Sequence, residues 1–177
     1  SMNVELFMKD VYDVTSVAVD PANVNHFYFT TWGEGVFEVE DGKVVALYDD
    51  KTTNGIIQSS WIGQPHYVRV DGARLDDKGN LWVLNAGNGV KVLQSNGKWS
   101  ALNFSPLKPL ENMRRLLITD KYKWLVGVRY QPGVFVFTES GTIEDMSDDK
   151  YRLFSPGGLI DRDGNKLSPS FFYDNSD

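Results

Sequence analysis

Three aspartates of this 177-residue sequence, Asp20, Asp76 and Asp120, each end an apolar segment of the same kind. Carboxylates brought to one position of a repeated structure would form a ring that binds a cation or the hydroxyl groups of a sugar. Alternatively, each aspartate ends a strand and accepts backbone N–H groups in the following turn, as aspartates commonly do. We favour the turn role and keep the cation or sugar site as the alternative.

A second group of acidic residues lies near the C-terminal end, where residues 161–165 read Asp-Arg-Asp-Gly-Asn and Asp174 follows. Calcium prefers several oxygen ligands, so a loop of this kind is a candidate for it. The segment lacks the alternating acidic register and the closing glutamate of a calcium loop. The acidic segment 144–149 has no better spacing. We therefore predict solvated turns, with no metal and no cofactor, and calcium as the less favoured alternative.

No residue type or spacing identifies a catalytic group. The two histidines, His26 and His66, have neither a neighbouring glutamate nor a second histidine at zinc-site spacing. The sequence contains no Gly-x-Ser-x-Gly nucleophile motif and no Gly-x-Gly-x-x-Gly phosphate-binding motif. The 24 acidic residues make some pairing of carboxylates inevitable, so glycosidase chemistry remains a distant alternative. We predict a protein that is not an enzyme.

Two tryptophans are the candidates for ligand binding. Trp32 lies beside a turn and Trp61 lies in a segment between repeats, where loops often carry recognition residues. An exposed indole there would offer a platform for a sugar or a peptide. Trp99 lies in an expected outer strand and is predicted to pack inside the protein.

These side chains must be positioned by a repeated pattern. The segment 26–36 aligns without a gap with 80–90, an offset of 54 residues that runs from Gly35 to Gly89, and a third copy places Gly133 a further 44 residues on. Each copy has an apolar segment ending in aspartate, a strand with a central Tyr28, Trp82 or Trp124, and a glycine turn. A period of about 40–50 residues with four short strands is typical of a β-propeller blade.

The repeats make structural predictions of their own. Gly35, Gly89 and Gly133 are expected to have positive φ because the chain reverses there. Asp41-Gly42 and Asn96-Gly97 predict hairpins with type I′ turns. The aromatic residues at the shared central position are expected to pack between neighbouring blades, because blade sheets are covered on both faces.

The fold class predicted is all-β: a partial β-propeller of about three four-stranded antiparallel blades, as a segment of a longer propeller, since propellers need about 4–8 blades to close. A short strand at 4–8 precedes the first full repeat. The chain is treated as one propeller segment. Its predicted parts are blade one (14–48), an insertion (49–65), blade two (67–104), a linker (105–112), blade three (113–154) and an extended tail (155–177).

Composition limits the partners. The net charge is −6, and the nearest basic feature, Arg114-Arg115, is too short to bind nucleic acid or an anionic membrane. The absence of cysteine excludes disulfides. No apolar run is long enough to span a membrane, and the first residues do not have the pattern of a signal peptide.

Five segments carry a resemblance to a known family: 14–21, 31–38, 77–82, 147–151 and 161–169. In them the chain resembles the two-component-regulator propeller repeats of Bacteroidetes-type proteins, and more closely the N-terminal propeller region of type IX (Por) secretion-system proteins. The resemblance extends from about Val14 to Pro169. It implies an exported protein, periplasmic or at the outer-membrane surface, with further blades and no enzyme chemistry.

We therefore expect a non-catalytic binding or scaffold module that offers loops to a protein or glycan ligand. The alternative is the ligand-sensing periplasmic propeller of a hybrid two-component regulator. Remaining blades of a longer protein, or an oligomer, would complete the ring. The ligand, the total number of blades and the oligomeric state are not predicted by the sequence.

Overall fold

The structure is a computed structural model that describes residues 13–104, 107, 113–127, 134–139, 142–154, 163 and 165. The predicted strand at 4–8, the turn at Gly133, most of the linker 105–112 and nearly all of the tail 155–177 lie outside these residues.

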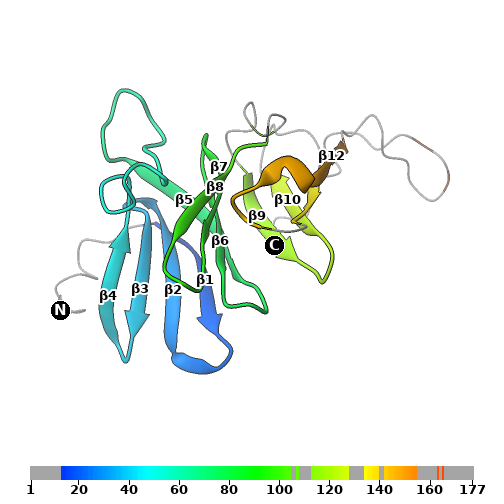
Figure 1. Ribbon diagram of the computed structural model, residues 1–177. Coiled ribbons are helices and arrows are strands. Elements are labelled where there is room, and N and C mark those ends of the chain that lie inside the picture. The colour runs from blue at the N-terminus through cyan, green and yellow to red at the C-terminus, as the bar shows by residue number, and fades with distance from the viewer. Residues whose placement is uncertain are drawn as a thin grey trace.

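The described residues form twelve β-strands and one short 3-10 helix, so the all-β prediction is confirmed (Figure 1). The first unit is β1 (Val14–Asp20), β2 (Asn23–Gly33), β3 (Val36–Glu40) and β4 (Lys43–Tyr48). The second unit is β5 (Val68–Leu75), β6 (Leu81–Asn85), β7 (Gly89–Leu93) and β8 (Trp99–Leu102). The third unit is β9 (Met113–Ile118), β10 (Lys123–Gly127), β11 (Val134–Thr138) and β12 (Lys150–Phe154), with the helix η2 (Met146–Asp148) before β12.

Within each unit, consecutive strands pair antiparallel. The first two units are joined into one eight-stranded sheet, because the end of β2 also pairs with β5 through Trp32–Arg69 and Gly33–Val68. The third unit is a separate four-stranded sheet. The assignment of these units as about three blades of a longer propeller stays a prediction.

The two predicted hairpin turns differ from each other. Asp41 and Gly42 have φ of 48° and 72°, the type I′ conformation that was predicted. At Asn96-Gly97 only the glycine has positive φ, 86°, and the N–H of Gly97 donates to the carbonyl of Gln94 at 2.8 Å. That prediction of type I′ was wrong: this loop is a turn closed by a glycine bulge, since the loop has three residues instead of two.

Gly35 and Gly89 have φ of 103° and 78°, as predicted. At Gly35 the space is also restricted, because a Cβ atom would collide with the backbone carbonyl oxygen of Tyr48 on the neighbouring strand β4. Gly42 has a similar φ, but nothing lies within 4 Å of the position of its Cβ. Alanine substitutions at Gly35 and Gly42 therefore distinguish the cost of backbone strain, which both share, from the cost of steric collision, which arises only at Gly35.

We expect Gly42→Ala to lower the free energy of unfolding by about 1–2 kcal/mol, the cost of left-handed backbone for a residue with a side chain. Gly35→Ala should cost about 2–5 kcal/mol, because the collision adds to the same strain. Urea denaturation of both variants measures the difference. Equal losses would show that β4 moves aside freely at Tyr48.

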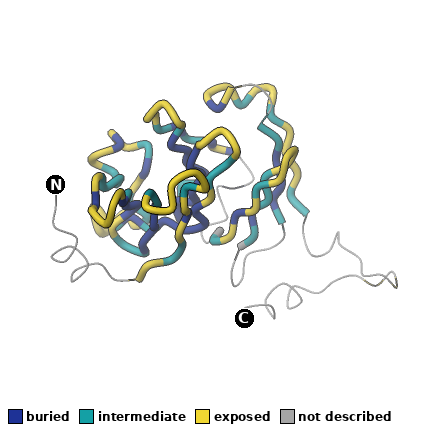
Figure 2. The backbone as a smooth tube through the Cα atoms, turned by 90° about the horizontal axis from the view of Figure 1, so that it is seen from below, coloured by how far each residue is buried: buried dark blue, intermediate teal, exposed yellow. Residues whose placement is uncertain are grey.

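Two clusters of buried hydrophobic residues join the units, one shared by the first and second and one by the second and third. Buried positions are dark blue along the backbone in Figure 2. Tyr28, with Val68, Val70 and Val83, belongs to the cluster shared by the first and second units. Trp82 is completely buried in the cluster shared by the second and third units, and its ring lies 6.0 Å from that of Phe137. The predicted packing role of the shared aromatic position is confirmed for these two residues.

The third residue at this position, Trp124, is half-buried beside Tyr122, with ring centroids 5.9 Å apart. Its neighbour Leu125 and the alternate residues of β11, Phe135 and Phe137, pack in the cluster with Trp82. Since side chains alternate along a strand, Trp124 lies on the opposite face of the third sheet. Neither of the other two described units covers that face.

Replacing the buried indole gives a direct test of the repeat. Trp82→Ala should lower the free energy of unfolding by roughly 3–5 kcal/mol, because it leaves a large cavity between two sheets. The indole N–H also donates to Asp76 at 2.8 Å, so the aspartate loses a partner. Urea denaturation measures the loss, with Trp61→Ala as the control for removing an exposed indole. A loss below about 1 kcal/mol for Trp82→Ala would contradict the packing role.

Candidate functional site

The segment between β4 and β5 is a loop fixed to the second unit by the side-chain amides of Asn85 and Asn88, the latter donating to the carbonyl of Ser59 at 3.2 Å. Asn85 is 2% exposed, accepts the N–H of Gln58 at 2.8 Å, and donates to the carbonyls of Gln58 and Arg69 at 3.0 and 3.2 Å. Thr53 closes the start of the loop by accepting the N–H of Ile57, a completely buried residue. The loop therefore has a rigid base at the upper ends of the sheets in Figure 1.

A groove of about 740 Å³ lies between this loop and the second unit. Trp61 and Ile62 at the outer part of the loop are 60% and fully exposed, which is unusual for large apolar side chains. The Trp61 ring meets Tyr67 edge to face at 6.4 Å. Apart from these three, the lining consists of Ser59, Ser60, Arg69, Gly87 and Asn88.

Trp32 contacts Arg69, a residue of the groove lining, and is covered by two guanidinium groups. Arg69 lies over its ring at 5.0 Å and Arg114 at 4.9 Å. Arg69 also lies 5.8 Å from the ring of Tyr67, and Arg114 donates its Nε to the buried carboxylate of Asp71 at 2.7 Å. We name these five residues the cation–π stack.

The two tryptophans predicted as ligand-binding candidates therefore have different surroundings. Trp61 lines the groove with an exposed ring, whereas Trp32 is half-buried within the cation–π stack. A ligand role for either stays a prediction, and only Trp61 has a ring face open to a ligand. Tyr67 and Arg69 were not singled out from the sequence. The alternation in Val68-Arg69-Val70, an arginine between buried valines, was the available signal.

The recurrent aspartates have the turn role at two of the three positions. Asp76 accepts the N–H groups of Lys78 and Asn80, the side-chain amide of Asn80 and the indole of Trp82, all within 2.9 Å. Burial raises the pKa of Asp76, but these hydrogen bonds, led by that of Trp82, outweigh it and hold the pKa below its usual value. Asp20 accepts the N–H of Ala22 at 2.8 Å. Both carboxylates are engaged in their own turns and do not form a shared site.

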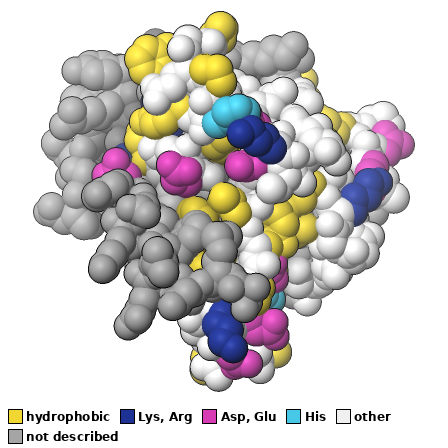
Figure 3. Space-filling view, turned by 90° about the vertical axis from the view of Figure 1, so that its left-hand side faces the viewer, with side chains coloured by type: hydrophobic (Ala, Val, Ile, Leu, Met, Phe, Trp, Pro, Cys, Tyr) yellow, Lys and Arg dark blue, Asp and Glu magenta, His cyan; other side chains and the backbone are white. Residues whose placement is uncertain are grey.

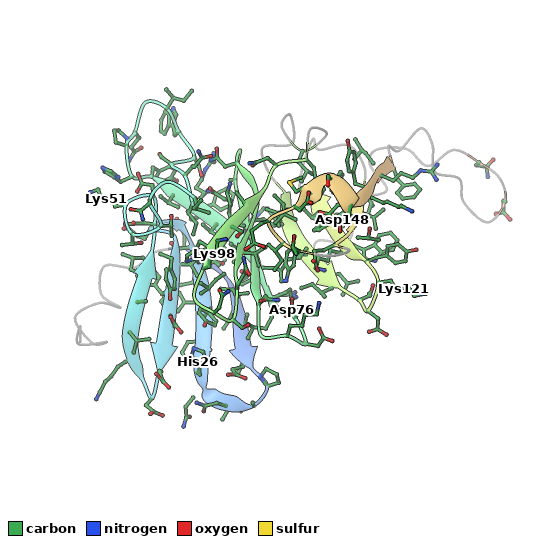
Figure 4. The ribbon with its side chains drawn as sticks, in the orientation of Figure 1. His26, Lys51, Asp76, Lys98, Lys121 and Asp148 are labelled. Carbon is green, nitrogen blue, oxygen red and sulfur yellow. The ribbon has the colours of Figure 1, made fainter. Side chains whose placement is uncertain are left out.

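A second polar cluster surrounds His26, near the lower end of β2 in Figure 4. The ring binds Asp20 through Nδ1 at 3.2 Å and Glu38 through Nε2 at 2.8 Å. Glu38 also accepts the hydroxyl groups of Tyr28 at 3.0 Å and Tyr48 at 2.6 Å. The two carboxylates bind opposite sides of the imidazole, so the cluster holds the ring and does not enclose a metal position.

These contacts shift the pKa values of the cluster. Burial lowers the pKa of His26, but the hydrogen bonds to Glu38 and Asp20 outweigh it and raise the pKa above 6.5. Burial raises the pKa of Glu38, but the hydrogen bonds from Tyr48, His26 and Tyr28 outweigh it and lower the pKa below 4.5. Burial and the Glu38 carboxylate together raise the pKa of both tyrosine hydroxyls.

No metal is indicated by the described part of the chain, where no group of three or more His, Asp or Glu side chains is arranged to hold an ion. Of the predicted calcium alternative, only Asp163 and Asn165 are among the described residues. His66 binds Asp50 at 2.7 Å and lies far along the chain from His26. On the side of the protein seen in Figure 3, basic side chains lie beside acidic ones in small groups, with hydrophobic side chains between the groups.

Solved structures with similar folds include the following two. One is PorZ, a bacterial surface component of the type IX secretion system of Porphyromonas gingivalis, with 27% identity and a TM-score of 0.73 over 84% of this chain. The other is the extracellular domain of a putative hybrid two-component system of B. thetaiotaomicron, with 16% identity and a TM-score of 0.57 over 82% of this chain. The chain spans about a fifth of the length of each, 20% and 18%. No protein-family model and no curated protein matches the sequence.

The likeness defines the class of protein as an all-β, propeller-like module of the kind found in these proteins. The resemblance inferred from the sequence motifs is confirmed, because one similar structure is a type IX secretion component and the other belongs to a two-component system. No helix of the described residues has the length and apolar character needed to cross a membrane.

The His26 cluster makes stability depend on pH. A raised histidine pKa means that the stabilisation is complete below pH 6.5 and is lost as pH rises through the raised value. The lowered pKa of Glu38 gives stabilisation above pH 4.5 that is lost as pH falls through the lowered value. His26→Gln should therefore destabilise the protein more at about pH 5.5 than at about pH 8.5.

Urea denaturation of the wild type and of His26→Gln at both pH values measures this difference. His66→Gln is the control, because His66 is half exposed and lies outside the cluster. The same loss for His26→Gln at both pH values would show that folding does not raise the pKa of this ring.

Proposed function

We propose that the chain is a non-catalytic binding module of an exported, propeller-containing protein related to type IX secretion components, and that its ligand-binding surface is the groove at Trp61. The groove carries the proposal, because it joins two exposed apolar side chains to a rigid wall of Tyr67 and Arg69. The likeness to PorZ, a surface component, supports an exported location, periplasmic or at the outer-membrane surface.

The lining favours a protein partner over a glycan. Tryptophan, tyrosine and arginine are the residues enriched at the energetic centres of protein–protein interfaces. Ile62 stands beside Trp61 and is fully exposed, and an aliphatic side chain gains more from an apolar partner than from sugar hydroxyls. Ser59, Ser60 and Asn88 add polar groups at the margin of the groove, where an interface has its polar rim.

The sensor function remains the second candidate. The domain of the hybrid two-component system supports it through the fold alone, since its identity to this chain is 16%. The 27% identity to PorZ supports our preference for the secretion-related function.

A random-peptide phage library selected against the whole chain tests the groove. We expect enriched peptides that compete with one another and that lose at least about tenfold in affinity, or 1.4 kcal/mol, on Trp61→Ala. The reason is that the exposed ring of Trp61 would contact the peptide directly but contributes little to folding. Tyr122→Ala is the matched control, because it removes a 44% exposed aromatic ring outside the groove and should leave affinity unchanged.

Two results would contradict the proposal. Selected peptides that bind Trp61→Ala as tightly as the wild type would place the site elsewhere, and binding in a glycan array with none to peptides would assign a different partner. Mass spectrometry of the incubated ligands tests the non-catalytic role, since any cleaved bond would indicate an enzyme.

A further inference from the structure

The first strand of each unit contributes to a second cavity, separate from the groove. Strand β1 packs against β5, and β5 packs against β9, so these three strands follow one another across the units. A cavity of about 400 Å³ opens between them. Its lining includes Thr15 and Ser16 of β1, Arg74 of β5, and Arg114 and Arg115 of β9, with Asp71 and Gly72 as the remaining members.

The lining is basic although the protein is acidic. Three arginines stand against one aspartate, a formal charge of +2, whereas the whole chain has a net charge of −6. Asp71 is 5% exposed, and both of its oxygens have partners. Oδ1 accepts the N–H of Gly72 and Oδ2 accepts the Nε of Arg114, each at 2.7 Å. The carboxylate therefore orients Arg114 and leaves the other two arginines without an acidic partner in the lining.

The guanidinium groups keep donors for a ligand. Arg114 uses Nε for Asp71, and among the described residues its two terminal nitrogens have no hydrogen-bond partner. Arg74 donates one terminal nitrogen to the carbonyl of Ala73 at 2.6 Å. Arg115 is exposed, and it has neither an ion pair nor a side-chain hydrogen bond to the described part of the chain. Paired N–H groups of arginine match the oxygens of a carboxylate or phosphate.

The opposite wall is held in place by hydroxyl groups. Thr15 donates to the carbonyl of Val70 at 2.7 Å, and the hydroxyl oxygen of Ser16 accepts the N–H of Ala73 at 2.9 Å. These bonds join β1 to β5 and set the separation between the two strands. Together with the bond from Arg114 of β9 to Asp71 of β5, they hold the three strands that line the cavity, and a site held in this way lowers the entropic cost of binding.

We propose that this cavity binds a small organic molecule carrying a carboxylate or phosphate group, held by Arg74, Arg114 and Arg115. The volume suits such a ligand, since pockets for small molecules measure about 300–1,000 Å³. The site does not depend on the function proposed for the groove, because the two linings share no residue.

Isothermal titration of the whole chain with citrate, inorganic phosphate and glucose 6-phosphate, against sodium chloride at constant ionic strength, tests the site. We expect saturable binding with a Kd on the order of 1 mM or tighter for at least one of the three probes. Citrate alone would identify a carboxylate ligand, and the two phosphates alone would identify a phosphorylated one. Arg115→Glu and Arg74→Glu should each weaken binding at least about tenfold.

Arg152→Glu is the matched control, because it changes the net charge equally but lies on β12, outside the cavity. It should leave the Kd within about twofold. Trp61→Ala should also bind the anion normally, which separates failure of this site from failure of the groove. Equal weakening by Arg152→Glu would reduce the effect to overall charge, and the absence of saturable binding for all three probes would overturn the proposal.

Discussion

The cation–π stack at Trp32 is the contact in which all three units meet. The indole comes from β2, Arg69 from β5 and Arg114 from β9. A cation–π contact contributes about 0.5–2 kcal/mol, so the stack is a small part of the total stability compared with the buried clusters. Its importance is geometric. The backbone pairing between the first two units is limited to the end of β2 and the start of β5, where Trp32 faces Arg69. The stack therefore lies at the junction of the three units, beside the backbone pairing that joins the first two.

Each of the two candidate sites is lined by one arginine of the cation–π stack. Arg69 lines the groove on one side of the indole, and Arg114 lines the cavity between the first strands. Each guanidinium is held by the ring of Trp32, and Arg114 is also held by Asp71. A charged side chain that is already fixed loses less entropy when it binds a ligand than a free one. The conformational entropy of these arginines is thus lost when the protein folds, so little more is lost when a ligand binds.

Local patterns in the sequence predicted the strands because they depend on near neighbours. Gly35 and Gly89 were placed correctly from their register, and Asp41-Gly42 has the predicted type I′ turn between β3 and β4. Asn96-Gly97 was predicted as the wrong turn type, because the dipeptide fits both turns and the loop length decides between them. The anchoring of the loop by Asn85 could not be predicted, since its partners at Gln58 and Arg69 lie 27 and 16 residues away.

The charge of the candidate anion site also could not be predicted from the sequence, because it depends on residues that only the fold brings together. Counted along the sequence, Arg114-Arg115 is a short basic pair in an acidic chain, and it gives no reason to expect an anion site. The fold brings Arg74 from a different unit beside this pair and pairs Asp71 with Arg114. Screening at physiological salt limits the influence of distant charges to about 8 Å, so an anion inside the cavity responds to these arginines more than to the net charge of the chain. The arrangement of charged side chains around the cavity between β1, β5 and β9, and not the composition of the chain, therefore determines which ligand this cavity favours.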